Sequence, residues 1–149
     1  MDVTLSMILR AVIGAFIGTV GFAMLVHVPK KSWLPSGIIA GMSYLIYWLL
    51  VQTGLPDPIG IFIGSLFGSL TGQLCARKMK MIGTVFLMSA IVPVVPGLGL
   101  YRMMAYLGQG QTKTGVELGI QAMITIAMIA LGLSVGSFID RLINHIRTD

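Results

Sequence analysis

One stretch of the chain places two prolines and two glycines inside an otherwise apolar run. It reads PVVPGLG at positions 93–99, within the apolar residues 81–107. A proline lacks the backbone N–H, so Pro93 leaves the carbonyl of Ser89 without its helical partner, and Pro96 acts in the same way. Unpaired backbone groups are costly in a bilayer unless they lie within protein or line a watery cavity. We therefore expect a broken helix whose free carbonyls and N–H groups bind a solute, with a kink that only shapes packing as the alternative.

The residues around the break supply a hypothetical substrate site. The N–H groups that begin the second half of the helix favour a carboxylate. Arg102 follows a few residues later and either pairs with an anionic solute or extends to the membrane interface. The residues of this hypothetical site are Ser89, Pro93, Pro96, Gly97, Gly99, Tyr101 and Arg102.

The other polar residues give no sign of catalytic or metal chemistry. His27 and His145 have no second metal ligand at a suitable spacing, and no nucleophile stands beside a plausible base. Cys75 is the single cysteine, so no disulfide forms within the chain. Asp57 and Glu117 are interpreted as charges at helix starts near the outer surface. We expect no enzyme active site, no metal and no cofactor.

The composition places these residues in a membrane. Of the 149 residues, 56% are hydrophobic and only 10% are charged, and the mean hydropathy is +0.92. A soluble domain needs more charge to cover its surface, whereas about 20 apolar residues suffice for one transmembrane helix. The net charge of +5 lies in short loops, which is typical of a topology signal and not of nucleic-acid binding. The chain is predicted to be all-α, a polytopic membrane helix bundle that forms a single transmembrane domain over residues 1–149.

Five apolar runs, separated by turn residues and basic residues, are the candidate transmembrane helices. Asp57 is expected to cap the third helix, with Pro58 in its first position. The fourth run contains the break at Pro93 to Gly99. The expected spans are about 11–28, 34–52, 58–76, 81–107 and 117–139.

The basic residues predict the orientation of these spans. Seven fall on one side of the membrane and three on the other. In a cell membrane, this asymmetry predicts an N-terminus outside the cell and a C-terminus in the cytoplasm. An odd number of spans does not divide into an inverted repeat, so a transporter of this kind would be completed by another chain. The seven are Lys30, Lys31, Arg77, Lys78, Lys80, Arg141 and Arg147, and the three are Arg10, Arg102 and Lys113.

Glycines recur every four residues along the third span. Residues four apart lie on one helix face, so this face lets another helix backbone approach closely. The expected helix-packing residues are Gly60, Gly64, Gly68 and Gly72.

Two motifs are similar to a known family. GFAM at 21–24 followed by Val28 and Pro29, together with IVPVVPG at 91–97 followed by Tyr101, resembles the small membrane subunit of the threonine/serine exporter family. His27 stands where that family usually carries Asn. The resemblance implies export of small amino acids, or of dicarboxylates such as succinate, together with a larger membrane subunit or as a homo-oligomer.

The leading hypothesis is thus a subunit that exports a small carboxylate-bearing metabolite across the bilayer. The alternative from another class is a membrane scaffold that transports nothing and only stabilises a partner.

Overall fold

The computed structural model describes residues 2–148, and its regular elements are all helical. The helices are α1 (Asp2–Leu25), the 3-10 turn η1 (Lys30–Ser32), α2 (Trp33–Gln52), α3 (Asp57–Lys78), α4 (Gly83–Ile91), α5 (Gly97–Gly108) and α6 (Thr112–Thr148). No strand occurs among the described residues. The predicted all-α class is confirmed.

Within residues 2–148, four helical stretches are long and apolar enough to cross a membrane. They are Ile8–Leu25, Lys30–Gln52, Asp57–Lys78 and Thr112–Ile143. The fourth predicted span is present as α4 and α5, which have 9 and 12 residues and are each too short to cross alone. The predicted bundle with a broken fourth helix is therefore confirmed.

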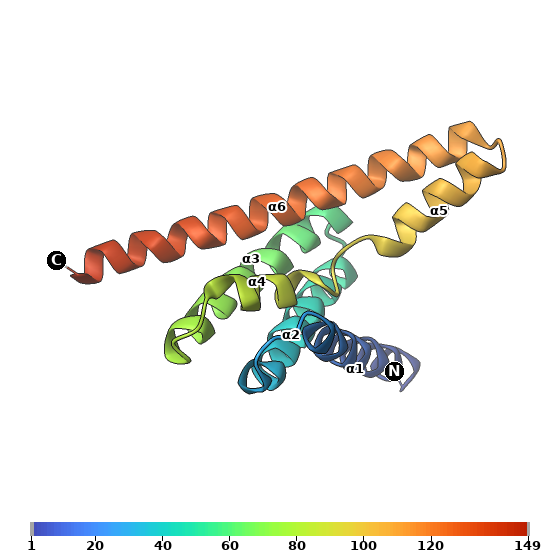
Figure 1. The fold of residues 1–149 in the computed structure, drawn as a ribbon. Helices are drawn as coiled ribbons and strands as arrows, with labels where there is room; N and C mark the ends of the chain where they lie inside the picture. The colour runs from blue at the N-terminus through green and yellow to red at the C-terminus, as the bar shows by residue number, and fades with distance from the viewer. Residues whose placement is uncertain (1, 149) are drawn as a thin grey trace.

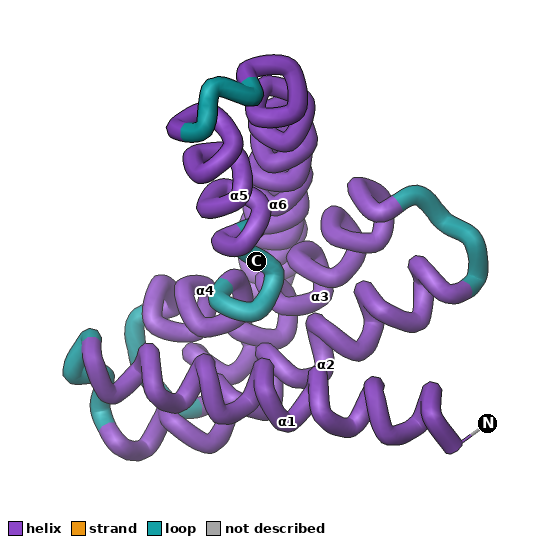
Figure 2. The backbone as a smooth tube through the Cα atoms, turned by 90° about the vertical axis from the view of Figure 1, so that its right-hand side faces the viewer, coloured by secondary structure: helices purple, strands orange, loops and turns teal. Residues whose placement is uncertain are grey.

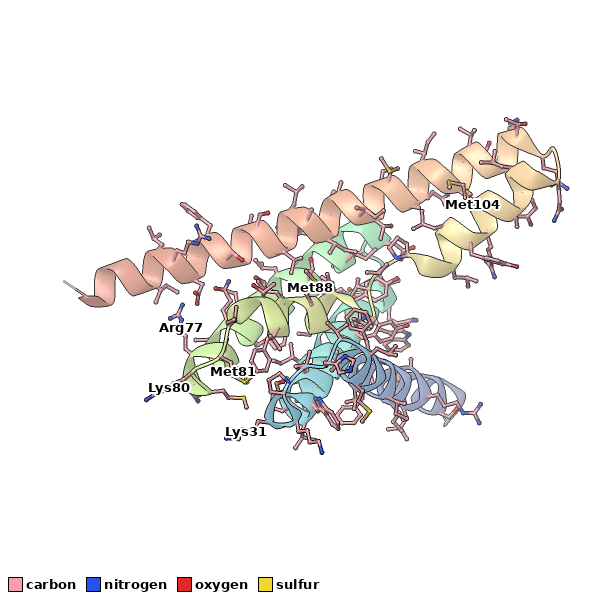
Figure 3. All side chains as sticks on the ribbon, in the orientation of Figure 1. Lys31, Arg77, Lys80, Met81, Met88 and Met104 are labelled. Carbon is pink, nitrogen blue, oxygen red and sulfur yellow. The ribbon has the colours of Figure 1, made fainter. Side chains whose placement is uncertain are left out.

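The α3–α4 turn and the C-terminus lie towards the left of Figure 1, and the α5–α6 turn and the N-terminus lie towards the right. The connection between α4 and α5 lies near the middle of the molecule. Lys31, Arg77 and Lys80 lie on the left side of the molecule, whereas Met104 of α5 lies on the right (Figure 3). Basic residues in or next to the α1–α2 and α3–α4 turns thus share one side of the bundle.

Helix α3 occupies the centre and contacts α2, α4 and α6 (Figures 1 and 2). On one face, Gly64 approaches α2 so closely that an added Cβ would lie 3.0 Å from the carbonyl oxygen of Ser43. Near its end, an added Cβ at Gly72 would lie 3.2 Å from Phe86 of α4. Gly60 also faces α2, and Gly68 is buried. All four glycines of the predicted packing face are buried within this chain.

Helix α3 contacts α6 through two of its serines. Helix α6 presents Gly132 and Gly136 to Ser65 and Ser69, which are fully buried. The Ser69 hydroxyl donates a hydrogen bond of 3.1 Å to the Leu133 carbonyl of α6. Small residues on both helices let the two backbones meet, which is how helices associate in lipid.

An ion pair ties the far ends of the same two helices together. Arg77 of α3 bonds the carboxylate of Asp140 of α6, and its guanidinium also donates to the Asp140 carbonyl at 3.3 Å. Asp140 is only 7% exposed, so the arginine neutralises a charge that is otherwise shielded from water.

The start of α3 differs from the sequence prediction. Pro56 is the N-cap of α3 and Asp57 lies inside its first turn, with no side-chain capping bond. The predicted cap by Asp57 is wrong because Pro56 already turns the chain into the helix. The carboxylate of Asp57 is left without a capping role.

Replacing Gly132 with Ala tests the α3–α6 contact. The new methyl group would lie against Ser65 and 2.7 Å from the carbonyl oxygen of Phe62. We expect the variant to lose about 1–3 kcal/mol of stability by overpacking, measured as a lower unfolding temperature in detergent. Gly21→Ala is the matched control, because Gly21 is exposed and nothing lies within 4 Å of its added Cβ. Equal unfolding temperatures for the two variants would contradict the contact.

Candidate functional site

A cavity of about 720 Å³ lies beside the break between α4 and α5. Four helices and the connecting segment contribute to it. Its walls are Tyr44 and Tyr47 of α2, Asp57, Pro58 and Ile61 of α3, Pro93, Val94, Pro96 and Leu98 at the break, and Gln121, Ile124 and Thr125 of α6. Residues far apart in the sequence therefore meet at the point where one helix is interrupted.

Backbone hydrogen bonds explain how the break is held. The N–H groups of Val94 and Val95 both donate to the carbonyl of Ile91, at 2.9 and 3.0 Å, which closes a turn after α4. Helix α5 then begins at Gly97 with Pro96 as its N-cap and no side-chain capping bond. The Gly97 N–H donates a hydrogen bond of 2.8 Å to the Val95 carbonyl. The positive end of the α5 dipole therefore lies at the cavity with no side chain hydrogen-bonded to it.

The polar side chains come from the other three helices. The rings of Tyr44 and Tyr47 meet edge to face, with centroids 5.7 Å apart and an angle of 64°. Thr125 donates its hydroxyl to the Gln121 carbonyl one turn earlier, at 3.1 Å. Asp57 adds a carboxylate that is itself exposed, at the open side of the cavity, and the described lining residues include no Lys or Arg. The cavity thus combines one negative side chain, neutral hydrogen-bonding groups and a helix N-terminus.

The structure separates the residues of the hypothetical site into two groups. Pro93 and Pro96 line the cavity, and Gly97 and Gly99 belong to the first turn of α5 next to it. The side chain of Ser89 lies outside the described side chains.

The other two residues of the hypothetical site lie elsewhere on α5. Tyr101 is 71% exposed, Arg102 is also exposed, and neither is among the described residues that line the cavity. The rotation of α5 is fixed by its contact with α6, and that rotation carries both side chains outward.

Sequence reasoning missed the contribution of α2 and α6. Tyr44 and Tyr47 are three residues apart, and Gln121 and Thr125 are four apart, so each pair shares one helix face. Polar pairs at helical spacing inside apolar runs were the available signal, because such residues usually face the interior of a membrane bundle.

His27 has a backbone role. Its φ is 56°, in the left-handed region, where Asn, Asp and His are tolerated better than other residues with a side chain. The turn between α1 and α2 is also held by Trp33, whose indole N–H donates a hydrogen bond of 2.9 Å to the Val28 carbonyl.

These features together define a polytopic helical membrane protein with a broken helix at its cavity, an arrangement typical of secondary transporters. The family described as "Threonine/Serine exporter, ThrE" matches residues 11–139, and the chain belongs to that family. The predicted resemblance is confirmed. The family is one of transporters and is not an enzyme class.

Two relatives illustrate the similarity. A threonine/serine exporter of Corynebacterium glutamicum is 27% identical over 130 residues, which cover 87% of this chain and 26% of the relative. An uncharacterized protein of Haemophilus influenzae is 27% identical over 90 residues, 60% of this chain and 30% of the relative. The chain thus spans less than a third of these curated relatives. No solved structure matches it significantly.

Cysteine accessibility tests whether the cavity holds water. In a Cys75→Ser background, Thr125→Cys places a thiol on the cavity wall, whereas Ile126→Cys places one on the neighbouring side of α6 that does not line it. We expect a charged, water-soluble thiol reagent to modify the first position and to spare the second, because thiolates form and react in water and not in lipid. Equal labelling of both positions would show that this wall is not solvated.

Proposed function

We propose that this chain forms part of the solute path of an exporter for small amino acids such as threonine and serine. The observation that carries the proposal is that a carboxylate and a helix N-terminus border the same cavity. Asp57 suits an ammonium group, and the uncapped start of α5 suits a carboxylate. Tyr44, Tyr47 and Thr125 supply hydrogen-bonding partners for a side-chain hydroxyl.

The same charges argue against a dicarboxylate as the solute. A second carboxylate would find no Lys or Arg among the described lining residues and would be repelled by Asp57. Arg102, the candidate anion partner, is exposed on α5. Succinate is therefore retained only as a competing solute in the experiment below.

The chain is proposed to act as one subunit of a larger assembly in the cell membrane. It corresponds to only 26% of the Corynebacterium glutamicum exporter, so most of that protein has no counterpart here. A larger membrane subunit, or a second copy of this chain, would supply the other walls of the path. A scaffold without transport is the outcome that the next experiment has to exclude.

Solute efflux tests the assignment. Vesicles from cells with the complete exporter are loaded with serine, threonine or succinate, and we expect efflux of the two amino acids but not of succinate. Asp57→Asn should slow serine efflux roughly 10–100-fold, because a hydrogen bond to a charged group contributes about 1.5–3 kcal/mol. Glu117→Gln is the matched carboxylate-to-amide control, because Glu117 is exposed and does not line the cavity.

Two results would contradict this assignment. Succinate efflux faster than serine efflux would favour the dicarboxylate reading, and no efflux of any of the three solutes would favour the scaffold.

Labelling from outside the cell tests the proposed orientation. With the N-terminus outside, the α5–α6 turn is external and the α3–α4 turn is cytoplasmic. In the Cys75→Ser background, an impermeant reagent should modify a cysteine at Gln111 and spare one at Lys80, both of which are exposed. The reverse pattern would invert the orientation and place Asp57 on the cytoplasmic side.

A further inference from the structure

A second cavity lies on the other side of the break. It measures about 310 Å³ and is bounded by small residues of α1, by Tyr44 and by Pro93. The small residues are Ala11, Gly14, Ala15 and Gly18. Among the described residues, Tyr44 and Pro93 are the two that line both cavities.

Tyr44 and Pro93 come from two different parts of the fold. Tyr44 is half-buried and is braced on one side by the ring of Tyr47, which lines the first cavity. Pro93 belongs to the segment between α4 and α5, where no regular helix runs. Tyr44 and Pro93 therefore form a wall that the two cavities have in common.

The α1 wall of the second cavity is open because of its glycines. Nothing lies within 4 Å of a Cβ added at Gly14 or Gly18. Glycines of α2 behave differently: a Cβ at Gly37 would lie 2.6 Å from the ring of Phe16. The α2 glycine thus serves the α1–α2 contact, whereas Gly14 and Gly18 are exposed, so the second cavity is open on its α1 side.

We infer that the two cavities are successive parts of one solute path and that Tyr44 is the positioning residue that separates them. The inference rests on the proposed function and names the route within it. Beyond the Tyr44 hydroxyl, the described side chains of the second cavity are apolar, so it passes a small zwitterion and does not hold it. A path needs such a weak segment, because a solute bound strongly throughout would not leave. The Tyr44 ring sets an upper limit on the size of the solute.

Filling the second cavity tests the route. Gly14→Leu and Gly18→Leu each place a side chain in the cavity, and Gly21→Leu is the matched control on the same helix, outside both cavities and with nothing within 4 Å. Each variant is measured in the complete exporter for serine efflux, for equilibrium binding of labelled serine and for assembly in native gels. We expect the two cavity variants to lose efflux roughly tenfold or more with binding and assembly unchanged, and the control to match wild type.

Changing Tyr44 tests the partition itself. Tyr44→Ala removes the ring and should raise leucine efflux relative to serine efflux by roughly tenfold or more, the scale on which pocket size discriminates substrates. Tyr44→Phe keeps the ring and should keep the wild-type ratio. A general loss of stability would lower the efflux of both solutes. It would not change the ratio of leucine to serine efflux in Tyr44→Ala while leaving that ratio unchanged in Tyr44→Phe.

The outcomes separate this inference from the function on which it rests. If wild type neither binds nor exports serine, the proposed function fails. If wild type exports serine and all three leucine variants export equally well, the route through the second cavity fails alone. Loss of efflux together with loss of assembly would assign the α1 face to a neighbouring helix and would also overturn the route.

Discussion

The close approach of backbones around α3 is the contact on which the rest of the structure depends. In lipid there is no hydrophobic driving force for helix association, so the helices associate through close packing and hydrogen bonds between them. Helix α3 meets α2 through Gly64, α4 through Gly72 and α6 through its serines. Because these contacts are short, they fix both the distance and the rotation of the three neighbouring helices. The cavity is the space left where α4 ends and α5 starts beside this central packing.

The break in the fourth helix is held by protein on several sides. Its amides are partly used in the turn after Ile91, and its prolines contribute no N–H that would need a partner. The cost of interrupting a helix in the membrane is therefore reduced before any solute binds. What remains is the uncapped start of α5, whose positive end faces a cavity with a single described carboxylate. Such an asymmetric site suits a solute that carries both charges.

The sequence was sufficient for features that depend on local chemistry. Paired prolines break a helix wherever they occur, and long apolar runs predict membrane helices from length alone. The cavity walls were harder, since they depend on helix rotation. Arg102 follows the break closely in sequence, yet it points outward because α5 packs on α6. Gln121 is distant in sequence and lines the cavity. Asp57 was expected to cap α3, but Pro56 occupies that position and leaves the carboxylate at the cavity.

The ion pair between Arg77 and Asp140 also has a consequence for the order of events during synthesis. The two residues are separated by 63 positions, so the ribosome releases Arg77 well before its partner exists. While the first three helices enter the bilayer, Arg77 is one of the basic residues that help to retain its turn on one side of the membrane. Once α6 is made and docks, the same guanidinium neutralises a shielded carboxylate. One arginine thus directs insertion early in biogenesis and secures the finished bundle later.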